Sequence, residues 1–296
     1  MSTFSPLYIL QIGTRWDGSQ NLIWAQFTEP ASEYSNLHIP KPRRYRNSIS
    51  RFMEEQPGKG VAHQFISDLM KPSLPDAQGN QQVLLGLTSL MQPTRYFCPA
   101  GDWFDGLGSR ISILRELLDP CIMVVMLNPR NPAKFLSNAW ASGAYPGFED
   151  VPPDPFTLSW SGVVEDVQRH NPETQILVCP VEVGPVVWPL ALQVLSGISD
   201  TATKTLQRAV ALYDMVDEGK ARLIQYLEDQ GDIPLNLSSR IITGFLKAYR
   251  RDKVHLSDCA IPGWTEAKSD MIEAQYEKDL NDLQKMEGIH FWGGSE

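Results

Sequence analysis

The sequence predicts an α/β fold in which helices cover both faces of a parallel sheet. Four apolar runs without polar-apolar alternation are expected to be strands, at residues 7–12, 83–87, 121–127 and 175–181. A strand that is apolar throughout must be covered on both faces, which is typical of parallel sheets. Segments with helical spacing lie between these runs. This alternation indicates a doubly wound sheet whose ligands bind at the carboxyl ends of the strands.

Four helices are expected among these strands, at residues 61–70, 104–118, 132–140 and 158–170. The second follows Asp102, a suitable N-cap, and repeats apolar residues at intervals of three and four. The third opens at Pro132, since proline is favoured in the first turn of a helix.

From about residue 201 the pattern becomes helical, with helices expected at residues 203–229, 235–250 and 266–286 and no strand between them. No Gly/Ser/Pro-rich linker divides the chain. We therefore expect a single domain over residues 1–296, with an α/β core at 1–200 and a helical C-terminal layer at 201–296. That layer could cover the site or form a seam between two copies, so the oligomeric state stays open.

Composition narrows the class of partner. The net charge of -9 argues against nucleic acid as the main partner. No apolar run reaches about 18 residues and no signal-peptide pattern precedes the first strand, so we expect a soluble, cytoplasmic protein without a membrane span. The four cysteines are far apart and the five histidines lack ligand spacing, so no metal site is expected.

The loop after the first strand has features of an anion-binding loop. Gly13 and Gly18 would let the backbone turn tightly and point N–H groups at an anion, while Arg15 could add charge and Ser19 a hydroxyl. It is not a Walker A loop, because no GK[ST] ends it. An ordinary strand-to-helix turn capped by Asp17 or Ser19 remains the alternative.

The third strand ends in Asn-Pro-Arg-Asn-Pro at residues 128–132, where prolines restrict the backbone on both sides of Arg130. The helix that follows carries Ser137. A fixed guanidinium, a hydroxyl and helix N–H groups together would suit an anion. The alternative is a solvated arginine.

Candidates for a general base are few. Glu182 follows the fourth strand, where a carboxylate could contact a ribose, position a loop or accept a proton. His63 falls in the helix expected at 61–70, where a histidine is more often structural. Neither has a partner visible in the sequence.

The order of these pieces resembles the sulfotransferase family, closest to a bacterial sulfotransferase-like branch. Ile12-Gly13 with Gly18-Ser19 precedes Arg130-Asn131-Pro132 and Ser137, and the likeness extends over nearly the whole chain. The resemblance implies a three-layer P-loop-NTPase-like fold with a central parallel sheet. It also implies 3′-phosphoadenosine 5′-phosphosulfate (PAPS), or its product adenosine 3′,5′-bisphosphate, as cofactor. The first loop would hold the 5′-phosphosulfate, and Arg130 and Ser137 the 3′-phosphate.

The first loop departs from the family pattern Gly-x-x-Lys-[Thr/Ser]-Gly-[Thr/Ser]-[Thr/Ser]. Trp16 stands at the Lys position and Asp17 follows it, and only Gly18 and Ser19 remain before Gln20. A carboxylate near the anion would cost on the order of a kcal/mol or more. A neighbouring arginine, at position 15, could replace the missing lysine charge.

Two functions therefore remain open. The first is sulfuryl transfer from PAPS to an unknown acceptor hydroxyl or amine, with Arg15, Glu182 and His63 as catalytic candidates. Its cofactor contacts would be Gly13, Arg15, Trp16, Gly18, Ser19, Gln20, Arg130 and Ser137. The second is a catalytically inactive sulfotransferase-like fold that binds a nucleotide, another anionic ligand or a protein partner.

Overall fold

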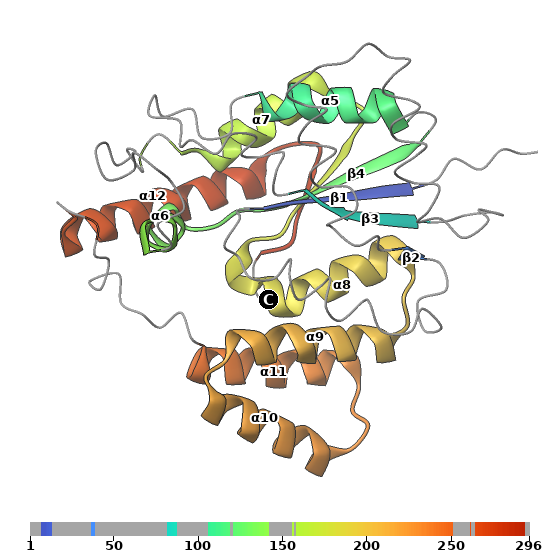
Figure 1. Ribbon diagram of the computed structural model, residues 1–296, viewed down its shortest axis with the longest axis vertical. Coiled ribbons are helices and arrows are strands. Elements are labelled where there is room, and N and C mark those ends of the chain that lie inside the picture. Colours follow the sequence, from blue (N-terminus) through green and yellow to red (C-terminus); the bar gives the residue numbers. More distant parts are fainter. Residues whose placement is uncertain are drawn as a thin grey trace, which may run out of the picture.

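The central feature of the fold is a parallel sheet (Figure 1). The computed structural model describes residues 7–13, 37–38, 82–87, 106–118, 121–141, 156, 158–250, 261 and 264–293. Within these ranges six strands lie in the order β2-β3-β1-β4-β5-β6, and all neighbours are parallel. The strands are β1 (Leu7–Gly13), β2 (Leu37–His38), β3 (Gln82–Gly86), β4 (Ile122–Asn128), β5 (Gln175–Val178) and β6 (Ile289–Phe291). The predicted α/β class and parallel sheet are confirmed.

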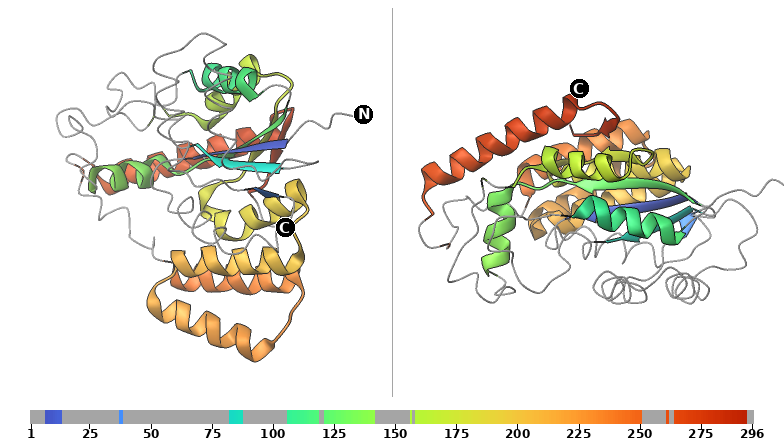
Figure 2. Two further views of the ribbon diagram at one scale, coloured as in Figure 1. Left: turned by 45° about the vertical axis from the view of Figure 1, so that its right-hand side comes forward. Right: turned by 90° about the horizontal axis from the view of Figure 1, so that it is seen from above.

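Helices lie on both sides of the sheet (Figure 1). On one side are α5 (Leu107–Leu118) and α7 (Trp160–His170), and on the other is α8 (Gly184–Ser196). Beyond α8 lie α9 (Asp200–Asp214), α11 (Leu235–Tyr249) and, outermost, α10 (Asp217–Gln230). The long helix α12 (Glu266–Lys285) packs against α6 (Pro132–Ala141) and α7, and Figure 2 gives two further views of this arrangement. No helix in the described ranges is long and apolar enough to cross a membrane.

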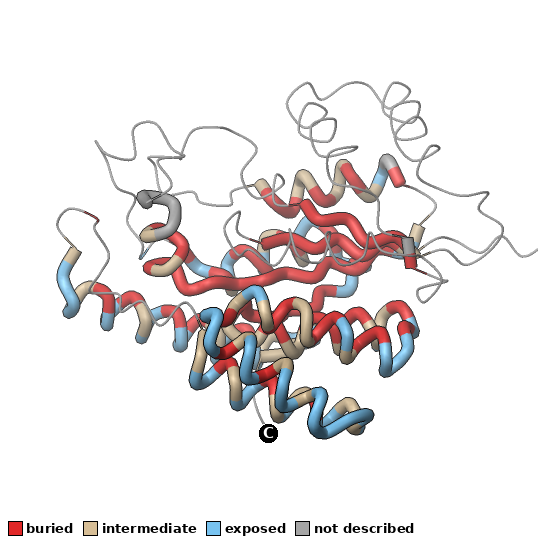
Figure 3. Tube along the Cα trace, turned by 60° about the horizontal axis from the view of Figure 1, so that its bottom comes forward, coloured by how far each residue is buried: buried red, intermediate tan, exposed pale blue. Residues whose placement is uncertain are grey.

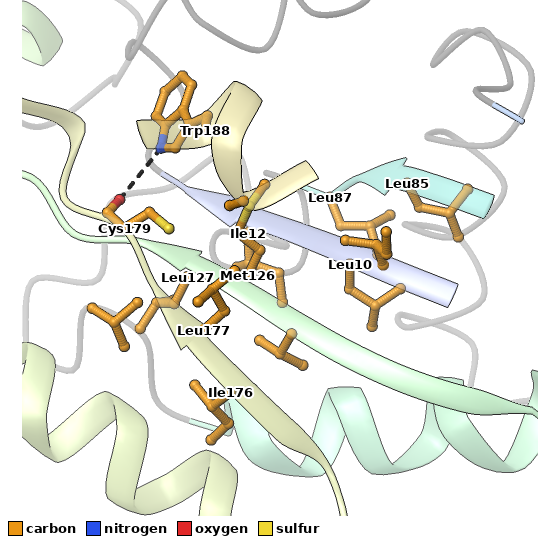
Figure 4. Packing of buried hydrophobic residues seen from close by; sticks show 14 of the residues in the cluster. Leu10, Ile12, Leu85, Leu87, Met126, Leu127, Ile176, Leu177, Cys179 and Trp188 are labelled. Carbon is orange, nitrogen blue, oxygen red and sulfur yellow. Dashed lines mark hydrogen bonds between the residues drawn. The ribbon is translucent and has the colours of Figure 1, made fainter. Parts of the chain in front are cut away.

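The core forms where apolar strand residues meet these helices. Nearly every residue of β1, β3 and β4 is buried, as the tube in Figure 3 shows. In the close view of Figure 4, Trp188 of α8 donates its indole N–H to the carbonyl oxygen of Cys179 at 3.4 Å. Cys179 is a free, fully buried thiol whose pKa burial raises, as expected of a core cysteine. The continuous apolar runs thus pack on both faces, as predicted.

The sequence analysis did not predict helix α8 or the short strands β2 and β6. The helix α8 is apolar on most sides because it lies between the sheet and α9, so it shows no amphipathic stripe. The strand β6 follows the last of the predicted helices and lies within residues 201–296, which were predicted to form a helical layer. It has only three residues, none of them buried, and joins the sheet by pairing Ile289 with Ile176 of β5.

The helix predicted at residues 203–229 is in fact two helices. The break falls at Met215, which is fully buried and forms an antiparallel bridge with Arg250. The next amide, that of Val216, donates to the carbonyl oxygen of Tyr249 at 3.0 Å. Met215 belongs to a second, smaller apolar cluster with Ala211, Leu223, Ile242 and Leu246. The single-domain organisation of residues 1–296 stays a prediction.

Helix α12 holds the start of α7 through a buried carboxylate. Asp279, 5% exposed, accepts hydrogen bonds from the amides of Trp160 and Ser161, the latter at 3.1 Å. The fully buried Trp160 donates its indole N–H to the carbonyl oxygen of Arg130 at 3.0 Å. Asp279 therefore supports the β4–α6 loop through one intermediate side chain.

We predict that Asp279→Ala lowers the free energy of unfolding by about 1–3 kcal/mol, because the buried amide of Trp160 and the partly buried amide of Ser161 lose their acceptor. Urea denaturation followed by circular dichroism measures this change. The control is Asp282→Ala on the exposed side of the same helix. Equal midpoints for Asp279→Ala and the wild type would contradict the capping role.

Candidate functional site

The two loops selected from the sequence leave neighbouring strands at one edge of the sheet. Gly13, the last residue of β1, is in register with Asn128, the last residue of β4. Their carboxyl ends are therefore adjacent in the interior of the sheet, where ligands of open α/β sheets bind. Five predicted cofactor contacts, Arg15, Trp16, Gly18, Ser19 and Gln20, lie outside the described residues, as does His63.

Arg130 is held rigidly at this edge. It is 3% exposed, and its carbonyl oxygen accepts the Trp160 indole N–H. The preceding carbonyl, that of Pro129, accepts the amide of Val181 at 2.8 Å, which joins the loop to the end of β5. The loop backbone, which the flanking prolines predicted to be rigid, is thus also held by hydrogen bonds to its carbonyl oxygens.

The first turn of α6 is closed by its own N-cap. The Asn131 Oδ1 accepts the amides of Ala133 at 2.8 Å and Lys134 at 3.4 Å, and the Asn131 carbonyl accepts the amide of Phe135 at 3.0 Å. Pro132 has no N–H to offer. The expectation that free α6 amides would help bind an anion is therefore not met, and an anion here must rely on side chains.

Glu182 lies in a short turn after β5 and faces this cap. Its Oε1 accepts the Asn131 amide at 3.2 Å, and its Oε2 accepts the hydroxyl of Tyr276 at 2.8 Å. Both carboxylate oxygens are thus engaged. Of the three roles considered for Glu182, these contacts favour that of positioning a loop.

A second carboxylate, missed in the sequence analysis, completes the network. The Asn131 side-chain amide donates to Glu273 Oε2. Burial raises the pKa of Glu273, Lys134 opposes the shift, and Glu182 adds to it. Burial and then Glu182 keep the pKa of Tyr276 well above 10, so Tyr276 acts as a hydrogen-bond donor. The signal in the sequence was the three-residue spacing of Glu273, Tyr276 and Asp279, which repeats polar groups on one helix face.

A cavity of about 850 Å³ opens beside Arg130 at the carboxyl ends of β4, β5 and β6. Its lining comes from the β4–α6 loop and the first turn of α6, the turn after β5, α8, α11, and the end of β6 with the residues that follow it. Five of its side chains are cationic: Arg130, Lys134, Arg240, Lys247 and Arg250. Glu182 is the sole carboxylate among the described lining residues. Ser137, half-buried on α6, is not part of this lining.

Comparison of the chain with models of known protein families gives no match, and a search of curated proteins gives none either.

We predict a pH-dependent effect of Glu273→Gln on stability. A carboxyl group whose pKa rises on folding adds stability below its unfolded pKa, about 4.3, and loses it as pH rises through the folded value. Glutamine keeps an acceptor for Asn131 but does not titrate. The variant should therefore gain stability relative to the wild type between about pH 4 and pH 7. Urea midpoints across this range test the sign, with the exposed Glu287→Gln as control; a pH-independent difference would contradict it.

Proposed function

We propose that this chain is a sulfotransferase-like protein that binds PAPS or adenosine 3′,5′-bisphosphate at the carboxyl ends of β1 and β4. The observation that carries the proposal is the buried Arg130, fixed beside the strand that leads into the first loop. The parallel sheet with β1 in its interior supports a P-loop-NTPase-like fold. The expected partners are this nucleotide and an acceptor of unknown structure.

The side chains near the end of β4 carry the positive charge that a 3′-phosphate requires. Arg130 offers a guanidinium suited to phosphate oxygens, and Lys134 lies one helical turn further along the same segment. The α6 amides are occupied, so these side chains would supply the attraction. Gly13 would contact the 5′-phosphosulfate end of the nucleotide. The other contacts to that end would come from residues 15–20, as the resemblance implies. Ser137 stays a predicted contact.

Bound PAPS would supply the sulfuryl group, and the protein would contribute position and charge, as in other transfers through loose anionic transition states. We assign Glu182 to positioning rather than to proton transfer, because both of its oxygens already accept hydrogen bonds. Through the Asn131 amide it fixes the start of α6 and the loop that carries Arg130. Arg15 and His63 stay candidates for charge stabilisation and for the base.

Nucleotide binding without transfer is the second candidate. Two observations favour binding without transfer. Both oxygens of Glu182 already accept hydrogen bonds, and Trp16 and Asp17 stand where the family has Lys and Thr or Ser. Calorimetric titration with adenosine 3′,5′-bisphosphate, beside ATP and sulfate, tests the binding shared by both candidates. Micromolar binding specific to the bisphosphate supports the proposal, and no binding overturns it. Transfer of radiolabelled sulfuryl from PAPS to water or to an added acceptor then distinguishes the two candidates. Transfer indicates an enzyme, and binding without transfer indicates a binding protein.

Arg130→Ala should weaken binding of adenosine 3′,5′-bisphosphate at least about tenfold, since a charge-assisted contact to the 3′-phosphate is lost. Arg130→Lys keeps the charge but loses the bidentate geometry. Its affinity for adenosine 3′,5′-bisphosphate should therefore lie between that of the wild type and that of Arg130→Ala. The exposed Arg169→Ala is the matched control. Circular dichroism checks folding, and unchanged affinity in folded Arg130→Ala would remove Arg130 from the site.

Restoring the family loop should strengthen the same interaction. We predict that Trp16→Lys combined with Asp17→Thr tightens binding of adenosine 3′,5′-bisphosphate, because a cation replaces an aromatic ring and a repelling carboxylate is removed. The same titration measures it, with the exposed Asp282→Lys, which also raises the net charge by two, as a charge-matched control. Equal or weaker binding would show that this loop serves a different ligand.

A further inference from the structure

The cavity continues past Arg130 to a wall made by α11, which the proposed nucleotide site does not use. We propose that this α11 side is a separate site for an organic anion, meaning a ligand with an apolar, ring-sized body and an acidic group such as a carboxylate or sulfonate. The proposal goes beyond nucleotide binding and does not depend on it.

One face of α11 carries the cations of this wall. Arg240, Thr243 and Lys247 follow each other at intervals of three and four and all line the cavity. These intervals place residues on the same side of a helix. The helix contains no aspartate or glutamate. Nothing within α11 therefore offsets the two charges that it presents.

These two cations are available to a ligand. Arg240 and Lys247 are exposed, and neither forms a salt bridge with a described residue. The sole carboxylate of the described lining, Glu182, is held by Asn131 and Tyr276. In a chain of net charge -9, such a local excess of cations in a concave site attracts anions.

Arg250 has a different function in this wall. It forms a salt bridge with Asp214 at 3.0 Å and donates to the carbonyl oxygens of Val181 and Glu182. These contacts join the end of α11 to the turn after β5. Arg250 thus builds the cavity, while Arg240 and Lys247 are left to bind its ligand.

The remaining lining determines what the anion must carry. Val183, Val186 and Val187 face the cavity from the α8 side, and Phe291 and Trp292 from the end of β6. The Trp292 amide is anchored to the carbonyl oxygen of Val178 at 2.8 Å. A volume of about 850 Å³ lies in the usual range for small-molecule sites. An inorganic ion would leave these apolar walls uncovered, whereas an apolar or aromatic body would cover them.

Fluorescence titration with 8-anilinonaphthalene-1-sulfonate, an aromatic sulfonate, tests the proposal. Its uncharged relative N-phenyl-1-naphthylamine reports the apolar walls alone. Replacing both cations, Arg240→Gln with Lys247→Gln, should weaken sulfonate binding at least about tenfold and the uncharged dye by less than about threefold. The control is Lys220→Gln with Arg222→Gln on α10, whose side chains pair with carboxylates on their own helix. Unchanged sulfonate affinity in the α11 double variant overturns the proposal.

Two further measurements keep the test specific to this cavity. Val187→Trp should fill the apolar side and weaken both dyes, and unchanged binding in this variant, with circular dichroism showing a native fold, places the dye elsewhere and overturns the proposal. Saturating adenosine 3′,5′-bisphosphate should leave sulfonate binding intact; competitive displacement would show that the nucleotide occupies the cavity and would overturn a separate site. Dye binding without any bisphosphate binding would reject the nucleotide proposal alone.

Discussion

The geometry of the site depends on Asn131. Its backbone and side chain together cap α6 and donate to two carboxylates from distant parts of the chain, Glu182 and Glu273. Tyr276 closes the network by donating to Glu182. The ends of β4 and β5 and the middle of α12 are thereby fixed to one another. Arg130, one residue before Asn131, takes its position from this arrangement.

This network places acidic groups close to a cationic cavity, and the two do not simply neutralise each other. Both carboxylate oxygens of Glu182 accept hydrogen bonds, and burial shifts Glu273 towards its neutral form. Burial of Glu273 limits how far that carboxylate cancels the surrounding cations, and Glu182 stands against five cationic side chains in the described lining. The described lining of the cavity therefore keeps an excess of positive charge.

The sequence was sufficient for the parts of the fold that depend on local pattern. The runs that became β1, β3, β4 and β5 are mostly apolar because both of their faces are covered, and Pro132 marks the start of α6. Helix α8 was not predicted because burial between two layers removes the amphipathic signal. Strand β6 was not predicted because its three residues pair only through tertiary structure. The contacts of Asn131 with Glu182 and Glu273 span 51 and 142 residues, so no spacing rule reveals them. The same holds for the α11 wall, whose face is defined by a cavity and not by an apolar stripe.

Lys134 links the two halves of the site. It lines the cavity and also lowers the pKa of Glu273, opposing the effect of burial. An anion bound near Lys134 would share that charge and add its own repulsion, and both effects favour the protonated form of Glu273. Because linkage is reciprocal, protonation of Glu273 must in turn favour the anion. The half-buried carboxylate of Glu273 would then also tie the affinity of the cavity to pH, without touching the ligand.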